Sequence, residues 1–132
     1  MGIWAEIMYT KNFSLREMAC KCGCGSTKMD AGFMVMLQLA REYAGIPFNI
    51  SSGARCIVHN KRIGGKKDSA HLPDKIGESH AADITFRNGF ELFIIIKALF
   101  KAGFRRIGIN FKLKFVHADN DSGKPQDTIF SY

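Results

Sequence analysis

Apolar residues recur at helical spacing in two long stretches of the chain. After Asp30, a residue type that often caps a helix, apolar side chains return every three or four positions up to Gly45, which suits the left-handed residue that ends a helix. A second stretch runs from Phe90 to Ala102 and stops at Gly103. We therefore expect two helices. On the second helix, the inward side chains are expected to be Leu92, Phe93, Ile96, Leu99 and Phe100.

Shorter patterns predict the remaining elements. Ser14 and Glu17 form a capping box, in which each side chain accepts a backbone N–H, so a short helix is expected to begin there. Four runs are typical of strands: residues 48–51, 81–86, 106–110 and 114–118. The last two are close enough in sequence to pair as an antiparallel hairpin. A loop rich in glycine and lysine is expected after Gly53.

This order of elements predicts an α+β fold, with helices packed on one face of a small, mostly antiparallel sheet. The chain has 132 residues, of which 46% are hydrophobic, enough for one core but not for two. We expect a single domain over residues 1–132, with an N-terminal extension over 1–12 and a polar tail over 120–132. The apolar runs are far shorter than the roughly 20 residues of a membrane span. No membrane span is predicted, and a monomer is expected.

The chain carries a formal net charge of +7, from 19 Lys and Arg against 12 Asp and Glu. Such a charge favours polyanionic surroundings such as nucleic acid, anionic lipid or bacterial wall polymer, although surplus lysine that only maintains solubility explains it equally well. The basic clusters are not interleaved with aromatic side chains, as a surface for base stacking would be. Nucleic acid is therefore the less favoured partner.

His71, Asp83 and His117 are the residues that we expect to bind a metal ion. Catalytic zinc sites use three protein ligands and leave a further position open. Asp83 and His117 lie in strands that are otherwise small and apolar, where a buried carboxylate is costly unless it is paired or bound to metal. Because side chains alternate along a strand, Asp119 should share a face with His117.

The segment between residues 51 and 65 reads SSGARCIVHNKRIGG. It resembles the pattern S-G-x-R-x-x-x-x-N-x-x-x-G-G of the zinc D-Ala-D-Ala carboxypeptidases and related peptidoglycan endopeptidases, which include phage endolysins and share the Hedgehog-like fold. Three later segments continue the resemblance, which covers about residues 13–119. They are Ser69-Ala70-His71, residues 81–84 (AADI) and residues 115–119 (FVHAD).

The resemblance implies a zinc metallopeptidase that hydrolyses an amide bond in the peptide stem or cross-link of bacterial peptidoglycan, as a carboxypeptidase or an endopeptidase. It assigns the zinc ligands His71, Asp83 and His117. It also assigns Arg55 to steadying the oxyanion, a role that suits a permanently charged guanidinium, and Ser69 to orienting substrate or a ligand. An ordinary ion pair for Arg55 and a turn hydroxyl for Ser69 stay open as alternatives.

The N-terminal sequence shows no export signal. We therefore expect synthesis in the cytoplasm and action on the cell wall after release through a membrane lesion, as for an endolysin of a phage or prophage. A metal-bound but inactive Hedgehog-like module that binds cell wall or a protein is the alternative function. A basic nucleic-acid-binding domain organised by the cysteines is a third.

The chain departs from the family pattern in two places. Residues 72–82 separate His71 from Asp83, which indicates an insertion of about five residues, and loop closure tolerates such an insertion at low cost. Ser79 replaces the family glycine, and His80 competes as a ligand, although it should face away from Asp83.

The second departure concerns the general base. Lys114 and Phe115 occupy the positions where many relatives carry a Glu or a His as the base. Asp119 is therefore the expected base, and its alternative role is to orient the ligand His117 or to cap the turn that follows.

Four cysteines are present, at positions 20, 22, 24 and 56. The C-x-C-x-C spacing differs from the C-x-x-C of structural zinc sites, so a second zinc ion is left as an alternative. We expect instead a disulfide from Cys56 to Cys20, Cys22 or Cys24. It would brace the loop of Arg55 against the N-terminal helix.

Overall fold

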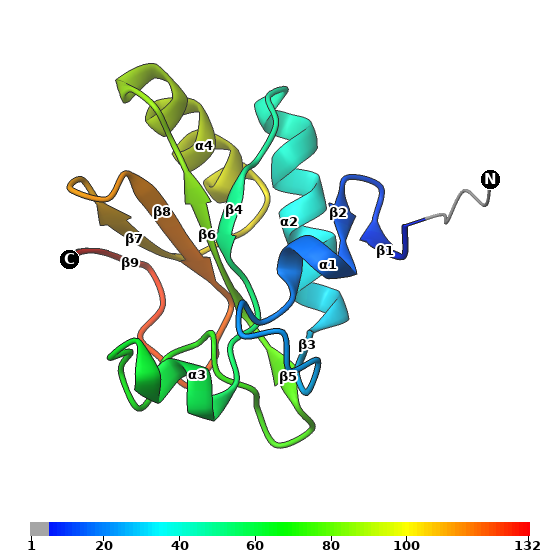
Figure 1. Ribbon diagram of the computed structural model, residues 1–132. Coiled ribbons are helices and arrows are strands. Elements are labelled where there is room, and N and C mark those ends of the chain that lie inside the picture. The colour runs from blue at the N-terminus through cyan, green and yellow to red at the C-terminus, as the bar shows by residue number, and fades with distance from the viewer. Residues whose placement is uncertain (1–5) are drawn as a thin grey trace.

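The structure is a computed structural model that describes residues 6–132. A five-stranded sheet with strand order β4-β6-β8-β7-β9 forms its centre (Figure 1). The strands of this sheet are β4 (Ile50–Ser52), β6 (Ala81–Thr85), β7 (Arg106–Asn110), β8 (Phe115–Asp119) and β9 (Thr128–Ser131). All neighbouring strands are antiparallel except β7 and β9, which are parallel. The predicted mostly antiparallel sheet is confirmed.

Two long helices cover one face of this sheet. The helices in the described part of the chain are α1 (Leu15–Met18), α2 (Ala31–Ala44), α3 (Ile57–Arg62) and α4 (Gly89–Lys101). Helices α2 and α4 pack against each other, and α3 lies apart from them at the opposite end of the molecule (Figure 1). The predicted α+β class is confirmed. Within residues 6–132, no helix has the length and apolar character needed to cross a membrane.

Local capping explains where the predicted helices begin and end. Ser14 Oγ accepts the N–H of Glu17, and Glu17 Oε1 accepts the N–H of Ser14, so the predicted capping box starts α1. Asp30 Oδ2 accepts the N–H of Phe33 at 2.8 Å at the start of α2. Gly45, with φ +69°, ends that helix in the left-handed conformation.

The prediction of which residues of α4 point inward is wrong in part. Phe93 and Phe100 are 65% and 45% exposed, whereas Ile95 and Ala98 are buried beside Leu99. Positions 95, 98 and 99 fit one helical stripe, and Phe93 and Phe100 lie outside it. The run of apolar residues at 92–96 allowed either stripe, and contacts with α2 and the sheet select one of them.

Two elements lie where other structure was expected. Helix α3 occupies the segment rich in glycine and lysine that was expected to be a loop, and this expectation is wrong for residues 57–62. Strand β9 lies within residues 120–132, the expected polar tail. It pairs in parallel with β7, with Gly108 opposite Phe130. A parallel pair needs no hairpin, so no turn signal marks it in the sequence.

Two small sheets complete the fold. Strand β1 (Met8–Thr10) pairs antiparallel with β2 (Phe13–Ser14), and β3 (Lys28–Met29) pairs in parallel with β5 (Glu78–Ser79). The expected N-terminal extension includes β1, and Thr10 Oγ1 donates to Gln38 Oε1 of α2 at 2.8 Å. Residues 1–5 of this extension lie outside the described residues. The single-domain organisation stays a prediction.

Side-chain alternation gives the main sheet two different faces. The face toward α2 and α4 carries apolar side chains of the core, namely Ala82, Ile84, Ile107, Val116 and Ala118. The residues between them point to the opposite face. These alternating residues include Asp83, Arg106, His117 and Asp119. The polar residues of β6, β7 and β8 are therefore gathered on the face away from the two long helices.

Candidate metal centre

His71, Asp83 and His117 converge at one point on this face. Nε2 of His71 and Nδ1 of His117 each lie 3.1 Å from Oδ1 of Asp83. One possible ligand atom from each residue lies within 4.8 Å of the other two. Asp83 and His117 are directly opposite each other on β6 and β8, whereas His71 lies in the loop between α3 and β5. Two paired strands thus place two of the side chains, and a loop places the third.

The outer nitrogen of each imidazole has an acceptor of its own. His71 Nδ1 lies 2.7 Å from the carbonyl oxygen of Gly53, and His117 Nε2 lies 2.6 Å from Oδ2 of Asp119. These acceptors favour the tautomer with the proton on the outer nitrogen, in which the inner nitrogen, once it no longer donates to Asp83, has a lone pair that can bind a metal ion. This is the tautomer that a metal ion bound between the three side chains requires.

The three side chains are buried, with exposures of 3% for His71, 6% for Asp83 and 5% for His117. Burial opposes ionisation of Asp83, but hydrogen bonds from His117 and His71 hold the pKa of this carboxyl well below its usual range. Burial also disfavours the charged form of His117, and its bonds to Asp119 and Asp83 overcome that effect and raise its pKa. A buried carboxylate between two imidazoles favours a cation at this point. Two imidazoles and one carboxylate are a ligand set that zinc accepts, so the residues fit a catalytic metal site.

Backbone and hydroxyl contacts hold the loop of His71 in place. The carbonyl of His71 accepts the N–H of Arg55 at 3.0 Å and the hydroxyl of Ser79 at 2.7 Å. The N–H of His71 donates to Ser69 Oγ at 3.2 Å. Ser69 therefore makes the contact of a turn hydroxyl. Ser79, which replaces a family glycine, supports the same loop.

Gly53 carries the carbonyl that orients His71, and it lies against the end of α1. A Cβ at this position would lie 2.6 Å from the carbonyl oxygen of Met18. The next N–H along the chain, that of Ala54, donates to the same Met18 carbonyl at 2.8 Å. The glycine of the S-G-x-R pattern thus has a packing reason in this structure, since a larger residue would displace the backbone.

Arg55 lines a pocket over the three convergent side chains, and its contacts involve two further positions of the same pattern, Asn60 and Gly65. Nη1 donates to Asn60 Oδ1 at 3.0 Å, and Nη2 donates to Ser52 Oγ at 3.1 Å. Asn60 Nδ2 in turn donates to the carbonyl of Lys66 at 3.0 Å. A side chain at Gly65 would collide with Asn60 Oδ1. The Nε atom of Arg55 is buried and has no partner among the described residues.

Asp119 is fully buried behind His117. Its Oδ2 accepts from His117 Nε2 and from Arg106 Nε, the latter at 3.1 Å, and its Oδ1 accepts the N–H of Asp121 at 3.1 Å. The carboxylate therefore contacts the ring nitrogen that faces away from Asp83. Three donors already surround it.

A pocket opens over the three convergent side chains, and two aromatic residues at the chain end line it. The ring of Phe130 lies 5.7 Å from that of His117 and 4.7 Å from the guanidinium of Arg106. Tyr132 is largely exposed, but partial desolvation of its side chain, together with the charge of Asp83, raises its pKa, so the hydroxyl keeps its proton and can donate. Neither aromatic residue was predicted for the site. Their spacing of two, typical of one strand face, was the available signal.

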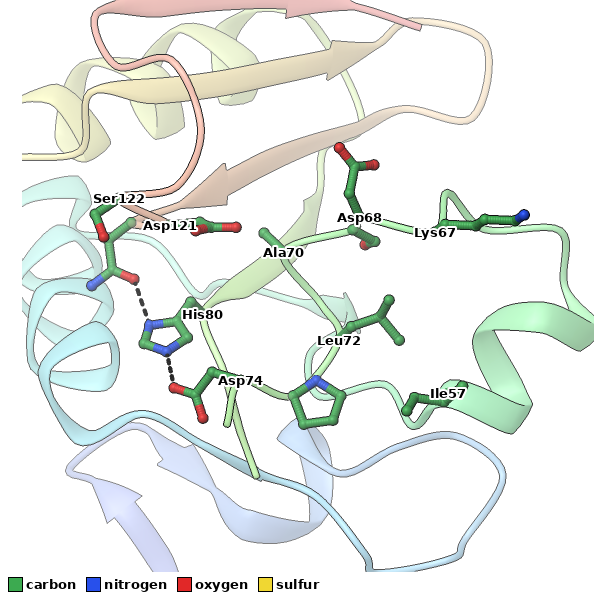
Figure 2. Close-up of a pocket in the computed structure, with 12 residues that line it drawn as sticks. Ile57, Lys67, Asp68, Ala70, Leu72, Asp74, His80, Asp121 and Ser122 are labelled. Carbon is green, nitrogen blue, oxygen red and sulfur yellow. Dashed lines mark hydrogen bonds and ion pairs between the residues drawn. The ribbon is translucent and has the colours of Figure 1, made fainter. Parts of the chain in front are cut away.

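His80 belongs to a neighbouring hollow (Figure 2). Its Nε2 lies 2.8 Å from Asp74 Oδ2, and its Nδ1 lies 3.1 Å from Asn120 Oδ1. Asp74 is part of segment 72–78, which contains the expected insertion of about five residues, and its Oδ1 accepts two backbone N–H groups of that segment. Segment 72–78 thus supplies a carboxylate partner for His80, which is not part of the group formed by His71, Asp83 and His117. Asp68 is among the residues that line both hollows.

The four cysteines are free thiols, so the expected disulfide of Cys56 is not formed. The expected proximity is nevertheless present. Cys56 Sγ lies 3.6 Å from Cys22 Sγ, which lies 3.4 Å from Cys20 Sγ. The loop of Arg55 thus meets the turn after α1 through cysteine side chains, without a covalent bond.

A buried group of two histidines and one aspartate, open to a pocket beside a fixed arginine, is typical of metal-dependent hydrolases. The family model described as Peptidase M15 matches residues 11–119, which is most of the chain, and the chain belongs to this family. The protein is accordingly a metallopeptidase, and its resemblance to the zinc D-Ala-D-Ala carboxypeptidases is confirmed. No curated protein gives a significant match to the chain.

Proposed function

We propose that the protein hydrolyses an amide bond in the peptide stem or cross-link of bacterial peptidoglycan. A zinc ion would be held by Nε2 of His71, Nδ1 of His117 and a carboxylate oxygen of Asp83. The observation that carries this proposal is that both outer ring nitrogens have acceptors, which turns the inner nitrogens toward Asp83. Zinc in this position supplies Lewis acidity and activates water. The net charge of +7 favours approach to an anionic wall polymer.

Arg55 is the residue to which we assign stabilisation of the negative charge that develops on the scissile carbonyl. Asn60 and Ser52 each accept a hydrogen bond from the guanidinium and fix its position, and the side chain lines the pocket. A donor held in place beforehand stabilises charge without reorganising during the reaction. Ser69 Oγ accepts the N–H of His71, and within residues 6–132 its hydroxyl donates to no acceptor, so its proton is available to the substrate.

We assign Asp119 to orienting His117 rather than to acting as the general base. Its carboxylate contacts Nε2, the ring nitrogen on the far side from Asp83, and two other donors also engage it. A carboxylate in this position fixes the ring and makes the opposite nitrogen a better metal ligand. This assignment replaces the expectation that Asp119 accepts a proton from the attacking water.

One observation favours the second candidate, a metal-bound module that binds wall or a protein without cutting. Among the described residues of the pocket, Asp68 is the carboxylate that remains besides Asp83 and Asp119. Its hydrogen bond from Lys124 lowers its pKa, which makes it a weak base. The two candidates therefore differ in whether the protein releases fragments from its ligand or only binds it.

Purified peptidoglycan sacculi distinguish these candidates. The zinc-loaded protein is expected to release peptide fragments, whose masses identify the bond that is cut, and a chelator should stop the release. His71→Ala should abolish it, whereas His59→Ala, which alters a histidine of α3 outside the convergent group, should not. Binding to sacculi without released fragments would support the non-catalytic module instead.

A further inference from the structure

A second group of metal-binding side chains lies outside the peptidase pocket. The sulfur atoms of Cys20, Cys22, Cys24 and Cys56 all lie within 4.8 Å of one another. The first three follow α1, whereas Cys56 is the N-cap of α3, so two distant segments of the chain meet at these sulfurs. We propose that the four thiolates bind one structural zinc ion.

The spacing of the sulfur atoms fits a shared ion. In a tetrahedral site with zinc–sulfur bonds of about 2.3 Å, the sulfurs are about 3.8 Å apart. The Cys20–Cys22 and Cys22–Cys56 separations are 3.4 and 3.6 Å. A disulfide would instead bring two sulfurs to about 2.0 Å. Cys22 lies near both neighbours at once, as a ligand in a cluster does.

Backbone N–H groups point at three of the four sulfurs. Cys20 Sγ accepts the N–H of Cys56 at 3.3 Å, and Cys56 Sγ accepts the N–H of His59 at 3.3 Å. Cys24 Sγ accepts the N–H of Ser26 at 3.5 Å. Such bonds favour the thiolate, which is the form that binds metal. Four sulfur ligands leave no open position, so this site would be structural rather than catalytic.

A tight turn at Gly23 brings Cys20, Cys22 and Cys24 together. Gly23 has φ +79°, a conformation that other residues rarely adopt, and its N–H donates to the carbonyl of Cys20 at 3.0 Å. The turn lets three cysteines at alternate positions face the same point. The sequence pattern argued against zinc because it lacks the usual C-x-x-C spacing. In the structure, Cys56 of another segment provides the fourth sulfur.

A zinc ion bound to these cysteines would stabilise the loop that carries Arg55, although the cysteines do not line the peptidase pocket. Cys56 directly follows Arg55, whose N–H donates to the carbonyl of His71. On the other side of the cluster, the carbonyl of Met18 accepts the N–H of Ala54. The ion would therefore tie the end of α1 to the loop that carries Arg55, while its ligands stay outside the residues that line the pocket.

Zinc content measured by elemental analysis tests the proposal. Wild-type protein, purified with its thiols reduced and loaded with zinc, is expected to hold two ions per chain. Cys22 and Cys24 are exposed, so the double variant Cys22→Ser/Cys24→Ser should remain folded and hold one ion. His71→Ala/His117→Ala should also hold one. Lys21→Ser, which alters an exposed residue of the same turn, should hold two.

Cobalt(II) gives a second readout, which does not depend on peptidase activity. Bound to thiolates, it produces sulfur-to-metal charge-transfer absorption, which we expect in the wild type and in the histidine variant and not in the double cysteine variant. This signal would persist even if the protein cut no peptidoglycan. A wild type that binds a single ion, lost in the histidine variant, would overturn the proposal. Four thiols that react as fast in the zinc-loaded protein as in the chelated protein would also overturn it.

Discussion

His117 Nε2 lies 2.6 Å from Oδ2 of Asp119, two residues further along β8. Side chains two positions apart in a strand share a face, so the strand itself brings the carboxylate to the ring. Nδ1 of the same ring faces Asp83 on the neighbouring strand β6. The imidazole of His117 therefore contacts two carboxylates. Asp119 orients the ring, and Asp83 would bind the metal ion beside it.

Asp119→Asn is expected to weaken zinc binding at the His71 site by about 10- to 100-fold. Asparagine retains an acceptor for His117 but loses the charge that faces Arg106. Competition with a chelating dye measures the affinity, and Asp127→Asn, which alters an exposed carboxylate outside the pocket, is the matched control. Unchanged affinity with turnover abolished at saturating zinc would instead identify Asp119 as the base.

Arg55→Lys should lower kcat by about 10²- to 10³-fold, the loss typical of removing one donor to an oxyanion. A lysine cannot bond to both Asn60 and Ser52 and would lose the fixed position. Zinc content should stay unchanged, and Arg62→Lys on α3 should leave kcat unaltered. Steady-state kinetics of peptide release measure kcat for both variants. Equal kcat values for Arg55→Lys and Arg62→Lys would contradict the assigned role.

Gly53→Ala is expected to destabilise the fold by about 1–3 kcal/mol, because the new methyl group would meet the carbonyl oxygen of Met18 at 2.6 Å. Gly89→Ala is the matched control, since a Cβ there meets no atom within 4 Å. That substitution should be neutral or slightly stabilising in helix α4. Urea unfolding measures both changes. Equal stability of the two variants would show that the backbone at Gly53 has room to adjust.

The ion pair between His80 and Asp74 should make stability depend on pH. Burial opposes protonation of His80, but bonds to Asp74 and Asn120, with Asp30 nearby, raise its pKa. Because the pKa of His80 is higher in the folded protein than in the unfolded chain, its protonation stabilises the fold. This stabilisation is complete below the unfolded pKa of about 6.5 and is lost as the pH rises through the folded pKa.

His80→Gln should therefore lower the free energy of unfolding more at about pH 5.5 than at about pH 8.5. Unfolding curves at several pH values, with His59→Gln as the control, measure this difference. A deficit that is the same at both pH values would mean that His80 is not protonated in the folded protein at acid pH.

Features that depend on local sequence could be predicted well. Asp30 and Gly45 set the ends of α2 through contacts within a few residues, and the pairing of β7 with β8 follows from a short connection. Strand alternation also placed Asp119 beside His117 in advance. In each case the interacting groups lie close together along the chain.

Features that depend on distant segments could not be predicted. Strand β9 pairs in parallel with β7, and Phe130 lies over Gly108, where a side chain would collide with its ring. Helix α3 has exposed Ile57 and Val58 and a cysteine as its N-cap, so it lacks the usual amphipathic pattern. The meeting of Cys56 with the turn after α1 likewise depends on how the whole chain folds.

The central claim is that His71, Asp83 and His117 bind a single metal ion. Anomalous diffraction at the zinc absorption edge, from crystals of the zinc-loaded protein, tests it most directly. The account predicts a peak about 2.0–2.2 Å from Nε2 of His71, Nδ1 of His117 and a carboxylate oxygen of Asp83. Zinc-loaded crystals with no peak there, and with both imidazoles still hydrogen-bonded to Asp83, would contradict it.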